Sequence, residues 1–260
     1  MAAPTDRRIL GKNRLVFADN SALKTYYEGK YREGGYGNSG CVIRGVRISD
    51  RYHVERQKAA LRLLALRQDD VVLDAGCGNG ALAALIAPLC RKVHGIDIAG
   101  NALSPQNAGL PNLQFQQMNV EQLEFRDATF DKVVCVETLE HVLNPIQALQ
   151  QIARVLKPNG RFVLSYPTIN ETTMKHWHLS RRIPISEHLN EWNLPELKAN
   201  LERDRLFTVI RTEGICFDFG PLAALKLWHR FFAEKITDLA LAIRRFPGNS
   251  QFVALELRRS

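Results

Sequence analysis

Short apolar runs alternate along this chain with stretches in which apolar residues recur every three or four positions. Such runs are typical of strands buried on both faces, and the longer spacing is typical of helices that cover a sheet. Because the two kinds of segment alternate, the pattern predicts an α/β fold with a parallel sheet and right-handed crossovers. The predicted strands are Val71–Asp74, Lys92–Ile96, Leu113–Gln116, Phe130–Val136, Arg161–Tyr166, Phe207–Phe217 and Gln251–Leu257.

The same pattern indicates which segments form helices and which do not. Tyr26–Gly37 is too rich in glycine for a stable helix, and its tyrosines suit either a flexible lid over a pocket or a poorly ordered leader. Lys157–Gly160 reads as a turn. The predicted helices run from Asp50 or Arg51 to Leu66, over Ala81–Ile86, Asn101–Ala108 and Pro145–Leu156, from Leu194 onward, and over Gly220–Phe246.

The stretch around Asp74 is where a ligand can approach the main chain closely. Asp74 ends an apolar run, and Gly76, Gly78 and Gly80 follow it before a helix begins. Asp97 ends the next strand, where doubly wound sheets grip ribose hydroxyls. The spacing G-x-G-x-G differs from the dinucleotide fingerprint G-x-G-x-x-G, and a carboxylate beside a pyrophosphate would bring two anions together. The pattern therefore predicts a nucleoside ligand that carries a cation.

This acid and glycine loop resemble the first motif of class I S-adenosylmethionine-dependent methyltransferases. Asp97, Asn119-Val120, Phe130–His141 and Leu156–Arg161 resemble the later motifs in the same order, over about residues 50–170. The family usually has an acid where Asn119 stands, but the asparagine carbonyl can still accept a hydrogen bond from the adenine amine. The resemblance implies S-adenosylmethionine as cofactor, with Asp74, Gly76 and Gly78 on its methionine side, Asp97 and Ile98 on its ribose, and Asn119 and Val120 on its adenine.

The resemblance also implies an architecture. We expect a Rossmann-like, doubly wound, seven-stranded sheet, mostly parallel with one antiparallel strand near the C-terminus, and helices on both faces. Residues 51–260 would form this domain after an N-terminal lid or leader segment over 1–50. Insertions at about 167–200 and 218–250 would build the substrate pocket.

The segment from Cys135 to Pro145 is most similar to the ubiquinone-biosynthesis O-methyltransferases and their small-molecule relatives. The resemblance implies that Arg56 reaches the cofactor carboxylate, and it assigns Glu137 to the cofactor side as well. His141 would stand nearest the transferred methyl, and His188 lies in a segment that crosses the substrate pocket in relatives, so both are the candidate catalytic residues. The expected reaction is methyl transfer to an oxygen of a small molecule or glycan, such as a natural product, a sugar or a quinone.

Two alternatives stay open. Glu137, Glu140 and His141 resemble the metal-binding motif of small-RNA 2′-O-methyltransferases, with a later histidine (176, 178 or 188) to complete a magnesium or manganese site. Nucleic acid is nevertheless the less favoured partner, because no RNA-binding module is evident, and no metal ligand is assigned. The other alternative is a scaffold that binds the cofactor without transferring its methyl group.

The charge distribution and the cysteines indicate which partners and which cellular compartment suit this chain. The net charge of +8 is uneven, with +8 over residues 1–68, −3 over 69–217 and +3 over 218–260. Basic flanks suit an anionic substrate or an anionic membrane surface, and the amphipathic C-terminal helix is compatible with the latter. Five cysteines show no metal-like pairing and indicate reduced thiols. With no secretory signal and no membrane-spanning run in the sequence, we expect a cytoplasmic protein.

Overall fold

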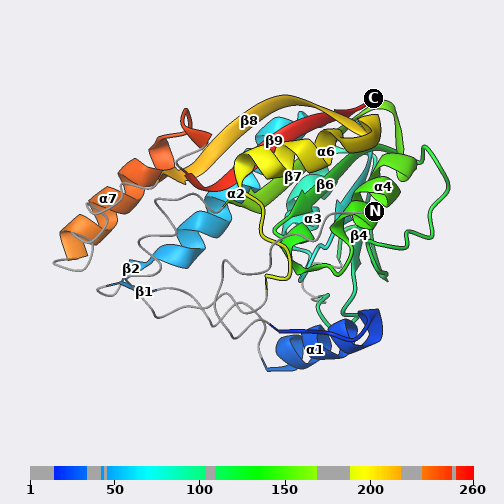
Figure 1. Cartoon of the computed structure of the whole chain (residues 1–260), viewed down its shortest axis with the longest axis horizontal. Coiled ribbons are helices and arrows are strands. Elements are labelled where there is room, and N and C mark those ends of the chain that lie inside the picture. Colours follow the sequence, from blue (N-terminus) through cyan, green and yellow to red (C-terminus); the bar gives the residue numbers. More distant parts are fainter. Residues whose placement is uncertain are drawn as a thin grey trace.

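A seven-stranded sheet forms the centre of the computed structural model, which describes residues 15–33, 42–43, 46–103, 109–168, 188–217, 230–247 and 250–260. Its spatial order is β5-β4-β3-β6-β7-β9-β8, and Figure 1 shows β8 and β9 along its upper side. The strands are β3 (Val71–Ala75), β4 (Lys92–Asp97), β5 (Leu113–Gln117), β6 (Phe130–Val136), β7 (Leu156–Pro167), β8 (Phe207–Phe217) and β9 (Ser250–Arg259). A separate antiparallel pair, β1 (Val42–Ile43) and β2 (Val46–Arg47), was not predicted.

The strand directions confirm the predicted mixed sheet. All neighbouring pairs from β5 to β7 are parallel, whereas β9 runs antiparallel to both β7 and β8. The chain moves outward from β3 through β4 to β5 and then crosses back to place β6 on the other side of β3. The order therefore reverses between β3 and β6, and ligands of doubly wound sheets bind outside the strand ends at such a reversal.

Helices cover both faces, as predicted. On one face, α2 (Ile48–Leu64) and α3 (Ala81–Ile86) share a buried cluster with Val72 and Val134 of the sheet. On the other face, α4 (Pro145–Val155) and α6 (Leu194–Glu202) pack on the opposite side of the same strands. A capping box at Asn193 and Glu196 fixes where α6 begins.

The first described helix contradicts the prediction for Tyr26–Gly37. α1 (Asn20–Arg32) lies at the lower edge of the molecule in Figure 1 and covers Tyr26–Arg32, while residues 34–37 lie outside the described part. The side chain of Asp19 accepts two backbone N–H groups of its first turn, and Leu23 and Tyr27 are buried. These contributions outweigh the cost of one helical glycine, which is about 1 kcal/mol.

Two other predicted elements differ from the structure. The predicted turn Lys157–Gly160 is a bulge inside β7, because Phe130 pairs with Leu156 and Lys132 then pairs with Arg161. Asn159 takes φ +59° there, a backbone conformation that asparagine tolerates. The described part of the predicted helix Asn101–Ala108, residues 101–103, is not helical.

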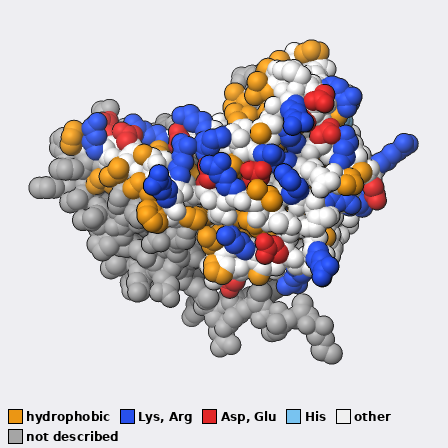
Figure 2. All heavy atoms as spheres, turned by 90° about the horizontal axis from the view of Figure 1, so that it is seen from above, with side chains coloured by type: hydrophobic (Ala, Val, Ile, Leu, Met, Phe, Trp, Pro, Cys, Tyr) orange, Lys and Arg blue, Asp and Glu red, His pale blue; other side chains and the backbone are white. Residues whose placement is uncertain are grey.

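The C-terminal helix is shorter than predicted within the described part. Of Gly220–Phe246, α7 covers Arg230–Ala242, the residues that follow it are not helical, and residues 218–229 lie outside the described part. Among the described helices, none is both long and apolar enough to cross a membrane. Figure 2 shows Lys and Arg side chains spread over the face above β8 and β9, with Asp and Glu among them. The anionic membrane surface stays a prediction.

Glu121 joins α1 to the loop that begins α4. Its side chain is buried, and Oε1 accepts the N–H groups of Leu143 (2.8 Å) and Asn144 (3.1 Å). Oε2 accepts the side-chain amides of Asn144 (3.0 Å) and Asn20 (3.2 Å). All four partners are donors, so both oxygens are needed.

We expect Glu121→Gln to lower the free energy of unfolding by about 1–3 kcal/mol, because the new amide would face donors and leave them unsatisfied. Chemical denaturation measures this loss. Glu124→Gln is the control, since Glu124 is exposed and its replacement should change stability by less than about 0.5 kcal/mol. Equal stabilities of the two variants would contradict the assigned role of Glu121.

Candidate active site

A tight loop connects β3 to α3 and brings its backbone to the reversal of the sheet. Gly76, Gly78 and Gly80 have φ of +81°, +52° and +81°, which residues with a side chain rarely adopt. The N–H groups of Gly76 and Cys77 both donate to the carbonyl of Ile96 in β4, at 2.9 and 2.8 Å. The loop is thereby held against the neighbouring strand, with glycine backbone exposed to any ligand above it.

This loop forms one wall of a cavity of about 750 Å³. Its volume lies within the range of about 300–1,000 Å³ that is usual for small-molecule sites. Every residue that the sequence assigned to the cofactor lines this cavity, and so does His141. These are Arg56, Asp74, Gly76, Gly78, Asp97, Ile98, Asn119, Val120 and Glu137.

Two carboxylates give the cavity a negative side. Asp74 is buried, and its Oδ2 has no hydrogen-bond partner in the described part of the chain. Burial, and secondarily the charge of Asp97, raises the pKa of Asp74 to about 7. Asp97 is held differently, because its two oxygens accept the N–H groups of Gly78 and Ala99, both at 2.9 Å. Burial also raises the pKa of Asp97, and these hydrogen bonds oppose the rise.

Arg56 and Glu137 form a buried ion pair beside the glycine loop. One guanidinium nitrogen of Arg56 lies 2.9 Å from Glu137 Oε2, and the other lies 2.8 Å from Nδ1 of His53. Ser165 donates to the second oxygen of Glu137 at 2.5 Å. Nε of Arg56 is buried without a partner among the described residues. The charges of Arg56 and Glu137 thus cancel, and the carboxylates of Asp74 and Asp97 remain as the excess negative charge of the cavity.

Asn119 and Val120 follow β5 and line the same cavity. Val120 is buried, and Oδ1 of Asn119 accepts the N–H of Glu121 at 2.9 Å. This hydrogen bond uses one of the two lone pairs on the asparagine carbonyl. A further contact from Asn119 to a ligand would use the second.

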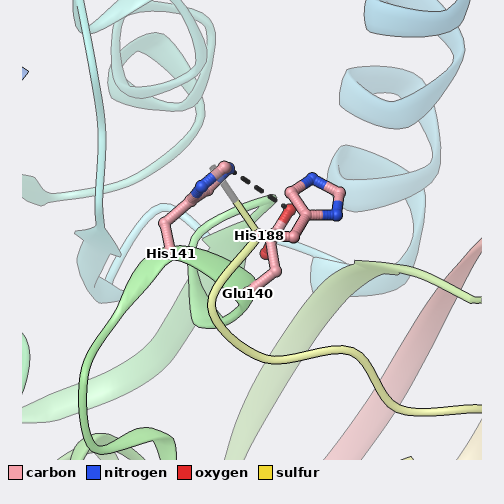
Figure 3. A group of neighbouring side chains, drawn as sticks. All are labelled: Glu140, His141 and His188. Carbon is pink, nitrogen blue, oxygen red and sulfur yellow. Dashed lines mark ion pairs between the residues drawn. The ribbon is translucent and has the colours of Figure 1, made fainter. Parts of the chain in front are cut away.

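The two candidate catalytic histidines lie side by side, although they are 47 positions apart in sequence. Their ring centroids are 5.1 Å apart. His141 lines the cavity from η4 (Leu139–His141), whereas His188 is not among the lining residues. Figure 3 shows both rings beside the carboxylate of Glu140. The other two candidate histidines, His176 and His178, lie outside the described residues.

Glu140 is completely buried, and neither carboxylate oxygen has a hydrogen-bond partner in the described part of the chain. Burial, with the charge of Glu137 adding to it, raises the pKa of Glu140 well above its usual range. Its Oε1 lies 3.8 Å from Nε2 of His141. The three side chains offer a cation one carboxylate and two imidazoles.

Several residues of the cavity wall were missed by the sequence analysis. α1 contributes Leu23, Tyr27 and Tyr31, and the Tyr27 and His141 ring centroids are 6.0 Å apart. His53 stands three positions before Arg56 on α2, a spacing that places both side chains on one helix face. This spacing was a usable signal for His53, whereas Tyr27 and Tyr31 were expected near a pocket only under the lid alternative for Tyr26–Gly37.

Comparison with known proteins adds the following findings. A family described as "Methyltransferase domain" matches residues 50–210. The ubiquinone biosynthesis O-methyltransferase of Paracidovorax citrulli is 42% identical over 113 residues, which cover 41% of this chain and 47% of that protein. A probable S-adenosylmethionine-dependent methyltransferase of Mycolicibacterium smegmatis is 35% identical over 159 residues, 61% of this chain and 59% of that protein. The chain therefore spans about half the length of these curated relatives.

The fold has solved counterparts. The methyltransferase that forms a complex with the Trm112 activator in Haloferax volcanii gives a TM-score of 0.62 at 21% identity. That match covers 94% of this chain and 99% of the other. At such low identity the likeness concerns the fold.

Proposed function

This chain belongs to the class I S-adenosylmethionine-dependent methyltransferases, and we propose that it transfers the methyl group of that cofactor to an oxygen of a small molecule or glycan. One observation carries the proposal more than any other. Asp74 presents a buried carboxylate oxygen without a partner to a cavity whose floor is glycine backbone. Such a group costs free energy until a cation pairs with it. The ammonium group at the methionine end of the cofactor is such a cation.

The remaining cavity residues suit the rest of the cofactor. The unpartnered Nε of Arg56 offers a donor to the cofactor carboxylate, and Glu137 holds the guanidinium in place for it. We assign Gly76 and Gly78 to the methionine side with Asp74. We assign Asp97 and Ile98 to the ribose hydroxyls, and Asn119 and Val120 to the adenine.

The chemistry needs alignment more than activation. The sulfonium methyl is already electrophilic, so the protein has to hold an acceptor oxygen in line with the carbon–sulfur bond and remove its proton. We place His141 at the acceptor hydroxyl because it lines the cavity and contacts the ring of Tyr27 edge-on, and we place His188 beside it. The name of the P. citrulli relative, an O-methyltransferase, supports oxygen as the acceptor atom.

Cofactor affinity is expected to depend on pH through Asp74. A carboxyl with a pKa of about 7 is protonated below that pH in the ligand-free protein, and a cationic ligand must then displace the proton. Affinity for S-adenosylhomocysteine, which carries the same ammonium, should rise up to about pH 7 and level off above. Below pH 7 it should fall toward about tenfold per pH unit.

Calorimetry between about pH 5.5 and pH 8 tests this dependence. Among the described residues, Asp97, Cys77 and Cys135 are the titratable groups that interact with Asp74. Burial raises the pKa of both thiols, so they stay neutral over this range. An affinity that stays flat across this range would contradict the pairing of Asp74 with the ammonium.

Transfer of label from methyl-labelled cofactor identifies the acceptor. Metabolite, lipid, glycan and RNA fractions of a cell extract are each incubated with the protein, and base-stable label in a small-molecule or glycan fraction is the expected result. Label that enters only RNA would replace the proposal with the RNA 2′-O-methyltransferase alternative. Tight cofactor binding with label in no fraction would favour the scaffold.

A further inference from the structure

The buried carboxylate of Glu140 lacks a hydrogen-bond donor among the described residues that would stabilise its negative charge. Its carboxylate is fully buried, and neither oxygen is hydrogen-bonded among the described residues. Arg56, the nearby guanidinium, is committed to Glu137 and His53. A buried carboxylate in this state either keeps its proton or takes up a positive ion.

Two imidazoles stand where such an ion would find further ligands. One donor atom from each of Glu140, His141 and His188 can be chosen so that all three lie within 4.8 Å of one another. Figure 3 shows that Glu140 and His141 come from one turn and that His188 reaches them from a different segment. The three donors therefore converge from two parts of the chain.

The segment that carries His188 is fastened to the turn of Glu140 by backbone hydrogen bonds. The N–H groups of Leu189 and Asn190 donate to the carbonyl of Glu140 at 2.7 and 3.0 Å. The side chain of Asn190 donates to the carbonyl of Val142 at 2.5 Å, and the hydroxyl of Tyr166 donates to the carbonyl of Asn190 at 2.8 Å. These anchors fix the position of His188 independently of its own ring.

We propose that Glu140, His141 and His188 bind a divalent transition-metal ion such as Zn²⁺ in preference to Mg²⁺. Two nitrogens and one oxygen suit an ion of intermediate softness, whereas Mg²⁺ prefers oxygen ligands only. Bonds of about 2.1 Å would set the donors about 3.4 Å apart in a tetrahedron, so the side chains would draw together by about 1 Å. Glu137 is outside the set because Arg56 and Ser165 occupy its two oxygens.

The site differs from the one that the sequence suggested as an alternative. The motif reading took Glu137, Glu140 and His141 as ligands and left the later histidine open. The structure brings His188 to the cluster and ties Glu137 to the cofactor side. Because the imidazole of His188 takes the place of the carboxylate of Glu137 in the ligand set, the expected ion is no longer magnesium.

The ion would face the acceptor end of the cavity, because His141 lines it. This step rests on the proposed function. With the ion bound, His141 would hold the metal instead of accepting the proton itself, and an acceptor hydroxyl on an open coordination position would lose its proton to solvent more easily. The oxygen then forms the bond to the methyl carbon, and the electron pair of the broken carbon–sulfur bond stays on sulfur as a thioether.

The test measures metal binding by the full chain without cofactor or acceptor, so that it can fail or succeed separately from methyl transfer. After treatment with a chelator and dialysis, the protein is titrated with Zn²⁺ in a calorimeter, and Co²⁺ serves as a spectroscopic probe. We expect one ion per chain, with visible absorption bands of a coordinated Co²⁺ ion.

Glu140→Gln and His188→Ala should each weaken Zn²⁺ binding about a hundredfold or more, since each removes one of three ligands. His94→Asn is the control, because His94 is a histidine outside the cluster and packs on β4 against the rings of Phe125 and Phe130. Circular dichroism confirms that each variant is folded, and Glu140→Gln keeps the side-chain volume.

Three results would overturn the proposal. Wild-type protein that binds no Zn²⁺ at micromolar concentration would mean that Glu140 keeps a proton beside the histidines. Unchanged binding in Glu140→Gln and His188→Ala would place the ion elsewhere. Saturation by Mg²⁺ but not by Zn²⁺ would refute the argument from the donor set.

Discussion

Asp74→Asn is expected to weaken the binding of S-adenosylmethionine and S-adenosylhomocysteine by about thirtyfold or more. Loss of one partner of a buried charged pair costs about 2–5 kcal/mol, and each 1.4 kcal/mol is a factor of ten in affinity. Both compounds carry the ammonium group, so both should lose affinity to a similar extent. Calorimetry with S-adenosylhomocysteine measures the loss without turnover.

The same substitution should leave the ligand-free protein as stable as before or more stable. Burial raises the pKa of Asp74 to about 7, so above that pH the folded protein holds a buried charge without a partner. Asparagine is neutral at every pH and nearly the same size. At about pH 8 the melting temperature of Asp74→Asn should therefore equal or exceed that of the wild type.

This combination separates a binding role from a structural one. Asp127→Asn removes the same charge from an exposed side chain on the surface and should change neither affinity nor stability appreciably. Loss of stability together with unchanged affinity in Asp74→Asn would show that the carboxylate serves the fold instead of the ligand. The pH dependence of cofactor binding should also disappear in Asp74→Asn.

The parts of the site that sequence could predict depend on local patterns. Asp74, Gly76, Gly78 and Asp97 follow apolar runs that are recognisable without the fold, and the carboxyl ends of adjacent parallel strands must meet at one edge. Their shared place on the cavity follows from the strand order alone. Such residues are predictable because the element that positions each of them is next to it in the chain.

Contacts between distant segments were beyond the same reasoning. Glu121 joins Asn20 to Asn144 across 124 positions. The sequence also left open which of three later histidines lies beside Glu140, and the structure brings His188 there. α1 was missed because its stability depends on Leu23 and Tyr27 being buried against the cavity region. Intrinsic helix propensity predicts a helix poorly when most of the free energy that stabilises the helix comes from tertiary packing.

The glycine loop carries the second large effect. Gly76→Ala is expected to lower the free energy of unfolding by about 2–5 kcal/mol, since two costs add. An alanine at φ +81° costs about 1–2 kcal/mol, and the new Cβ would lie 2.3 Å from Oγ1 of Thr138, where overpacking adds about 1–3 kcal/mol. The corresponding fall in melting temperature is roughly 5–15 °C.

Gly29→Ala is the matched control, because it introduces the same methyl group in an environment that accepts it. Gly29 lies within α1, and a Cβ built there meets nothing within 4 Å. Alanine in a helix is better than glycine by about 0.5–1 kcal/mol, so this variant should be slightly more stable than the wild type. Thermal denaturation of the two variants beside the wild type should thus give shifts of opposite sign. A Gly76→Ala protein with the melting temperature of the wild type would mean that the loop and Thr138 relax freely. The close packing of Gly76 against Thr138 would then not constrain the cofactor site.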